Sequence, residues 1–165
     1  MGWSQGEYNP INPQKVIGIE FKKPFYRSGW ERTVMLSLDQ NPKVLRWGSE
    51  THKIPYNFSL TESKRNYYVD FYVEMLNSKN TIDKFLIEVK PDSQTRLPAP
   101  PKNKNFKAQK NYNYRLIEFK KNQDKWKFAN SFSRNSNIQF IITTEKGIYI
   151  VQENGLKKIS DKNFF

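Results

Sequence analysis

The 165-residue chain contains no cysteine and only one histidine, His52. The absence of cysteine excludes disulfides and cysteine-bound zinc, and a single histidine excludes a histidine cluster within one chain. Any metal site must therefore use oxygen ligands, which are typical of Mg²⁺ or Mn²⁺. The seven glycines are scattered and form neither G-x-x-x-x-G-K-[ST] nor G-x-G-x-x-G, so we expect no nucleotide binding by a glycine-rich loop.

Long apolar runs and acidic residues are also scarce. No apolar run approaches the roughly 20 residues of a membrane-spanning helix, and no secretory signal follows Met1, so we expect a soluble intracellular protein. Against 28 Lys and Arg stand only 16 Asp and Glu, which leaves a formal charge of +12. This excess indicates a polyanionic partner, and nucleic acid fits better than an anionic membrane surface.

Aromatic residues are plentiful, with 12 Phe, 9 Tyr and 4 Trp. Most of them are expected to fill a small core. Aromatic side chains among lysines and arginines also suit the stacking of nucleobases, so a single-strand binder built on an aromatic sheet is one alternative.

The order of the expected elements predicts an α/β fold with a mixed sheet. Residues 1–23 show little periodicity and read as an irregular arm. A helix is expected from the N-cap Ser28 to about Asp39, where Asn41-Pro42 ends it. Strands are expected at 43–47, 51–58, 66–76, 84–90, 138–143 and 148–151.

A stiff connector and two helices are expected between the strands at 84–90 and 138–143. The connector is 97–101, the first helix covers 102–121, and the second starts near Asp124. One domain is the simplest organisation at this length. We divide the chain into the arm, a core domain at 24–145 and a C-terminal extension at 146–165.

Glu31 is the first of three acids in unusual places. Glu31, Val34, Met35 and Leu38 have the spacing of one helix face, so this acid lies on the stripe that should meet the sheet. The pattern Ser28-Gly29-Trp30-Glu31 is also a capping box, which alone would explain the glutamate. Capping and metal binding are not exclusive.

Asp70 is expected in the middle of the strand 66–76, although aspartate is depleted in strands. In that strand Tyr67, Val69, Phe71, Val73 and Met75 would share one face. Asp70 would share the other with Tyr68, Tyr72 and Glu74, so a solvated polar face is the alternative to a functional role.

Glu88 and Lys90 end the strand 84–90 on one face, because strand side chains repeat every two residues. Strands 66–76 and 84–90 form a hairpin, across which Asp70 and Glu88 can approach each other. Two such carboxylates repel unless a divalent cation lies between them. Lys90 would then orient or activate a water, or stabilise charge on a phosphate.

These acids lie within a longer pattern that resembles the PD-(D/E)-x-K nuclease superfamily, and more narrowly the head-completion nucleases of T4-like phages and the TnsA-type transposon endonucleases. The resemblance covers about Tyr26 to Ala129. Val69 stands where the superfamily has proline. Its segments include Tyr26-Arg27-Ser28-Gly29-Trp30-Glu31, Trp47-Gly48-Ser49-Glu50, Ile54-Pro55-Tyr56, Tyr67-Tyr68-Val69-Asp70, Phe85-Leu86-Ile87-Glu88-Val89-Lys90-Pro91 and Asp124-Lys125-Trp126-Lys127.

The resemblance implies a restriction-endonuclease-like α-β-β-β-α-β core with a mixed central sheet flanked by helices. It implies that Asp70, Glu88 and Glu31 bind the metal and that Lys90 is the catalytic lysine. The activity would be metal-dependent cleavage of double-stranded DNA during head completion. The protein would then act in the host cytoplasm during phage assembly, associate with the virion, or contact portal and neck proteins.

Several basic residues are candidates for phosphate contacts, although such residues are more often merely solvated. Glu50 is either near the metal or an ordinary loop carboxylate. A basic structural head protein that holds DNA without cutting it is the second alternative, and the intact set of acids argues against it. The candidates for nucleic-acid contacts are Arg27, Lys64, Arg65, Lys102, Lys104 and Lys107.

Overall fold

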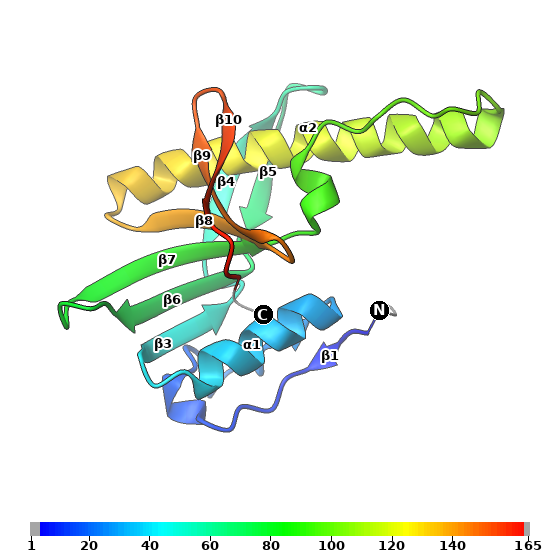
Figure 1. Ribbon diagram of the computed structural model, residues 1–165. Helices are drawn as coiled ribbons and strands as arrows, with labels where there is room; N and C mark the ends of the chain where they lie inside the picture. The colour runs from blue at the N-terminus through cyan, green and yellow to red at the C-terminus, as the bar shows by residue number, and fades with distance from the viewer. Residues whose placement is uncertain (1–3, 164–165) are drawn as a thin grey trace.

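The computed structural model describes residues 4–163 and contains a six-stranded mixed sheet in the order β10-β9-β8-β7-β6-β3 (Figure 1). Only β7 and β8 are parallel, and the other neighbours are antiparallel. The strands are β3 (Val44–Ser49), β6 (Phe71–Leu76), β7 (Ile82–Val89), β8 (Gln139–Thr144), β9 (Gly147–Gln152) and β10 (Gly155–Ser160). Residues 1–3 and 164–165, the outer ends of the expected arm and extension, lie outside the described range.

One helix and one hairpin with a second helix cover the two faces of the sheet. Helix α1 (Gly29–Gln40) packs Val34, Met35 and Leu38 on one face, where Phe71 and Ile87 lie. Helix α2 (Phe106–Asn135) packs on the other face together with the hairpin of β4 (Lys53–Phe58) and β5 (Ser63–Tyr68). The order α1, β3, β6, β7, α2, β8 is the expected α-β-β-β-α-β core, with β4 and β5 inserted.

The long strand expected over 66–76 is wrong, because the chain turns at Val69 and Asp70. Tyr67 and Val69 belong to the core under α2, whereas Phe71 and Val73 belong to the core under α1. The alternating pattern continues across two strands of different sheets, so the residues cannot share one face. Asp70 therefore lies at a corner and not in mid-strand.

The two helices expected over 102–121 and from Asp124 are also wrong, since α2 is one helix of 30 residues. Nothing in its sequence breaks it, and Asn105 caps its start by accepting a hydrogen bond from the Ala108 N–H at 2.8 Å. The residues around the expected boundary, Lys120-Lys121-Asn122-Gln123, are compatible with a continuous helix.

The segment before α1 is largely irregular and is fixed by one buried acid. It contains β1 (Gly6–Glu7), β2 (Phe25–Tyr26) and a 3-10 turn at Pro13–Lys15. Asp39, at the end of α1, accepts hydrogen bonds from the Tyr8 hydroxyl and from the N–H groups of Ile11 and Asn12. After β8, strands β9 and β10 extend the central sheet, and the 3-10 turn Asp92–Thr95 follows β7.

None of the helices within residues 4–163 combines the length and the apolar character needed to cross a membrane.

Candidate active site

Glu88 and Lys90 lie at the end of β7 and point to the side of the sheet that carries α2. Glu88 is buried, with 2% of its side chain exposed. Its Oε2 accepts a hydrogen bond from the Tyr67 hydroxyl at 2.5 Å, and its Oε1 is 2.9 Å from the ammonium of Lys90. The Lys90 N–H donates to the carbonyl of Thr143 at 3.0 Å, which ties the end of β7 to β8. The carboxylate is thus held from both sides.

Asp70 meets Glu88 through the register of the β6–β7 hairpin. Phe71 pairs with Ile87, so one further step of the register brings Asp70 opposite Glu88. Asp70 Oδ2 accepts a hydrogen bond from the Val89 N–H at 2.8 Å, and its carbonyl accepts one from the Glu50 N–H at 3.0 Å. The turn at the end of β5 therefore presents this acid to the end of β7.

The charges of the two acids act on each other. Burial, and then the charge of Glu88, raise the pKa of Asp70 well above its usual range, although Lys90 and the Val89 N–H lower it. Burial alone would lower the pKa of Lys90, but the charges of Glu88 and Asp70 outweigh it and raise this pKa. Burial and the same two acids keep Tyr67 protonated by raising its pKa. Lys90 is thus a cation at neutral pH.

Glu31 lies near this group but is occupied by the start of α1. Its Oε2 accepts a hydrogen bond from the Arg27 N–H at 2.8 Å, and its Oε1 accepts one from the Ser28 hydroxyl at 3.0 Å. Ser28 in turn accepts from the Glu31 N–H at 3.2 Å. The capping box is therefore present, and the charge of Glu31 still contributes to raising the pKa of Asp70.

The donor set for a metal consists of a pair of acids and a third one nearby. Within residues 4–163 no three acidic or histidine side chains are grouped so that they hold a metal site ready-made. Asp70 and Glu88 nevertheless fit a hard divalent cation, because they are facing oxygen donors with more negative charge than Lys90 neutralises. Glu31 would have to release its capping contacts to join them.

A second lysine, Lys125 of α2, completes the site and was not singled out from the sequence. Its ammonium lies 5.2 Å from the centre of the Tyr67 ring, and Tyr67 holds Glu88. Burial, which outweighs the attraction of Glu88, lowers the pKa of Lys125. The signal was its spacing, because Lys125 lies three residues after the buried Asn122 and four before the buried Ala129.

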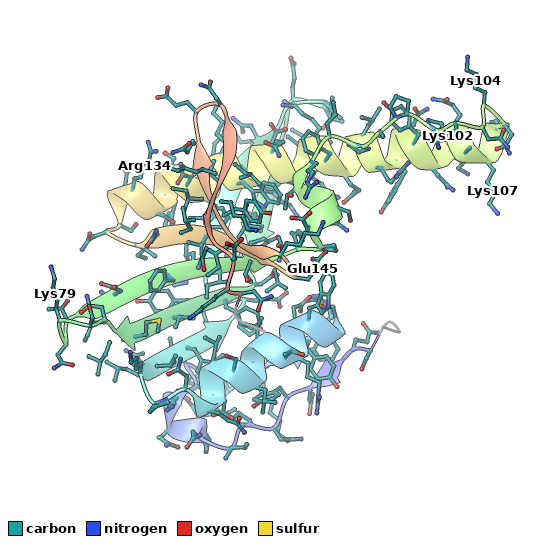
Figure 2. The ribbon with its side chains drawn as sticks, viewed as in Figure 1. Lys79, Lys102, Lys104, Lys107, Arg134 and Glu145 are labelled. Carbon is teal, nitrogen blue, oxygen red and sulfur yellow. The ribbon has the colours of Figure 1, made fainter. Side chains whose placement is uncertain are left out.

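The expected phosphate-binding residues fall into three places. Arg27 forms an ion pair with Glu50 at 3.0 Å. Both residues line a cavity of about 410 Å³, which is also lined by Lys22, Lys23 and Tyr68. Lys64 and Arg65 lie on β5, where the Arg65 guanidinium is 4.2 Å from the centre of the Phe58 ring. Lys102 and Lys104 lie in the connector before α2 and Lys107 in the first turn of α2 (Figure 2).

Comparison with known proteins agrees with this arrangement. The family described as TnsA-like endonuclease N terminal matches residues 41–145, which include β3 to β8 and the whole of α2. This chain belongs to that family. Over 143 residues it is 36% identical to the head completion nuclease of Enterobacteria phage T4, and the match covers 87% of this chain and 92% of that protein. No solved structure matches the chain.

Membership in the TnsA-like family confirms the resemblance inferred from the sequence, including the relationship to the T4-like head-completion nucleases. The mixed sheet with helices on both faces agrees with the expected restriction-endonuclease-like fold. The matched segment contains Asp70, Glu88, Lys90 and Lys125, whereas Glu31 precedes it.

Proposed function

We propose that this chain is a DNA endonuclease that depends on Mg²⁺ or Mn²⁺. The observation that carries the proposal is the buried Glu88, which faces Asp70 and touches Lys90 in a fold that belongs to an endonuclease family. A buried carboxylate that faces a second, half-buried one is costly, and a cation that both acids bind offsets that cost.

Asp70 and Glu88 would hold the metal, with Glu31 as the third acid. A bound metal would supply Lewis acidity, which activates water and offsets charge on the phosphate. Tyr67 fixes the orientation of Glu88 through its 2.5 Å hydrogen bond. Because Lys90 is protonated, its ammonium is suited to stabilise the charge that develops on the phosphate rather than to accept a proton.

The biological setting is proposed from the relative. The T4 protein is named a head completion nuclease, and the alignment covers nearly all of it. We infer that this chain acts on double-stranded DNA in phage head completion, in the cytoplasm of the host, with a portal or neck protein as a further candidate partner. Arg27, Lys64, Arg65, Lys102, Lys104 and Lys107 are the proposed phosphate contacts.

The two alternatives have less support. A single-strand binder would need an aromatic face on the sheet, but Tyr56, Phe58, Tyr67, Phe71 and Phe140 are all buried. A silent structural protein would have no reason to keep Glu88, Tyr67 and Lys90 bonded in a buried group.

A plasmid-nicking assay tests the proposal. Wild type, Glu88→Gln and Lys90→Met are incubated with supercoiled DNA in Mg²⁺, in Mn²⁺ and in chelator. We expect metal-dependent nicking by wild type and rates at least about 100-fold lower for both variants. Glu74→Gln is the matched control, because Glu74 is a partly buried acid on β6 that pairs with Tyr72 and Arg46 away from Glu88. Equal rates for wild type and Glu88→Gln would refute the proposal.

A further inference from the structure

The first half of α2 contributes no buried side chain to the core. The buried residues of the helix are Asn122, Asp124, Trp126, Ala129 and Ser133, all in its second half. No side chain in 106–117 is buried, and Phe106 is 85% exposed. Figure 1 shows this half and the connector before it projecting past the sheet, on the side where β7 ends. We name residues 97–117 the basic arm.

The basic arm carries charge of one sign. It contains five cations, Lys102, Lys104, Lys107, Lys110 and Arg115, and no Asp or Glu. No ion pair among residues 4–163 involves any of the five. Figure 2 shows Lys102, Lys104 and Lys107 pointing away from the protein around the tip. A polyanion is the partner that this charge fits.

The arm is poorly stabilised by itself. Most of the stability of a helix in a protein comes from packing of an apolar face, and residues 106–117 bury no side chain. Lysines close to the start of α2 also oppose the helix dipole, which favours acids there, and the first turn of α2 contains none. An anionic partner bound along the arm would offset the unfavourable interaction between these lysines and the helix dipole.

The same helix joins the arm to the catalytic group. Lys125 lies beside Tyr67 and Glu88, and Lys107 precedes it by 18 residues. At 1.5 Å per residue the two are about 27 Å apart along the helix, which corresponds to about 8 base pairs at 3.4 Å each. We propose that the basic arm holds the backbone of duplex DNA about 8 base pairs to one side of the cut. This proposal rests on the proposed endonuclease function.

The test compares two variants that lose the same charge. The arm variant carries Lys102→Gln, Lys104→Gln, Lys107→Gln and Lys110→Gln. The control carries Lys79→Gln, Lys84→Gln, Lys157→Gln and Lys162→Gln, all of them exposed lysines outside the arm. Lys79 lies at the end of the sheet that is far from the basic arm (Figure 2).

Binding is measured in EDTA with fluorescent duplexes of increasing length, so that no cleavage is needed. We expect the arm variant to bind long duplexes at least tenfold more weakly, with a salt slope smaller by about 2–4, because each lost phosphate contact removes about 0.9. For each protein, affinity should increase with duplex length until the binding site is filled. This limiting length should be about 8 base pairs longer for wild type than for the arm variant. The control should stay close to wild type in affinity. Circular dichroism checks that both variants are folded.

Equal weakening in both variants would mean that only net charge matters and would overturn the proposal. Unchanged DNA binding by the arm variant would overturn it as well and would favour a protein partner for the arm. Absence of nicking by wild type would refute the endonuclease function, whereas the EDTA measurement would still report on the arm.

Discussion

Asp92, which is buried, and Asp70, which is half-buried, have pKa shifts of opposite direction. Asp92 accepts a hydrogen bond from the Tyr149 hydroxyl at 2.7 Å and pairs with Arg96 and, at 3.2 Å, with Lys146. Burial raises its pKa, but these donors outweigh burial and hold the pKa below its usual range. At Asp70, the residue directly before the ladder with β7, burial and the facing Glu88 outweigh the donors and raise the pKa.

The difference shows that burial alone does not mark a functional acid. Asp124 resembles Asp92, because the Ser59 N–H and hydroxyl and Lys120 outweigh its burial and lower its pKa. These two acids are satisfied by their own surroundings and act as anchors. At Asp70 the favourable contacts do not outweigh burial and the facing Glu88, so the ionised carboxylate lacks a compensating partner, which is the property expected of a cation site.

The largest expected effect separates the two groups by activity. Asp70→Asn should lower metal-dependent nicking at least about 100-fold, because it removes a charged oxygen donor from the pair. Asp92→Asn should stay within a few-fold of wild type at a temperature where both are folded. Initial nicking rates at fixed Mg²⁺ measure this. A comparable loss of nicking in Asp92→Asn would contradict the assignment of a functional role to Asp70 and a structural role to Asp92.

The next largest expected effect is on the free energy of unfolding, to which Asp124 and Asp70 should contribute with opposite signs. Asp124→Ala should lower the free energy of unfolding by about 2 kcal/mol, since the Ser59 N–H loses its partner in a part-buried site. Urea unfolding followed by circular dichroism measures this. The loss should stay constant down to about pH 4 and shrink only as pH falls further, because an acid with a lowered pKa stabilises the fold above the pKa of an unfolded aspartate, about 3.9, and loses this contribution as it is protonated in the folded state.

Substitution of Asp70 should change the free energy of unfolding in the opposite direction to substitution of Asp124. Its pKa is raised in the folded state, so the ionised carboxylate destabilises the fold above the pKa of an unfolded aspartate, about 3.9. Asp70→Asn in EDTA should therefore raise the free energy of unfolding by about 1 kcal/mol at pH 7. The gain should vanish near pH 4. Destabilisation at pH 7 would contradict the assigned environment.

Metal binding should depend on pH through the same group. Protonation of Asp70 competes with a cation, so the affinity for Mn²⁺ should increase as pH rises through the raised pKa. Titration calorimetry in buffers of different ionisation enthalpy should also detect proton release. Asp70→Asn should bind Mn²⁺ weakly and with a flatter dependence on pH than wild type.

The smallest expected effect on stability concerns Glu31. Glutamine also serves in a capping box, so Glu31→Gln should change the free energy of unfolding by less than about 0.5 kcal/mol. A large loss of nicking with this small change would assign Glu31 to the metal. Unchanged nicking would leave it as a cap alone.

Some of the fold was predictable because it depends on local patterns. The capping box at Ser28 and the stop at Asn41-Pro42 set the ends of α1, and the apolar run near Ile141 predicted a strand covered on both faces. The break at Asp70 was not predictable, because the alternation of Tyr67 to Val73 is the same whether one sheet or two receive it.

The sequence by itself determined which chemistry was available: oxygen ligands for a metal, a strong positive charge, and the acids and lysine of an endonuclease pattern. The tertiary structure decided which acids are satisfied, that Tyr67 and Lys125 join Glu88, and that half of α2 stands away from the sheet. These points depend on distances between segments remote in the chain, and a pKa follows from the donors and charges around a group rather than from its neighbours in sequence.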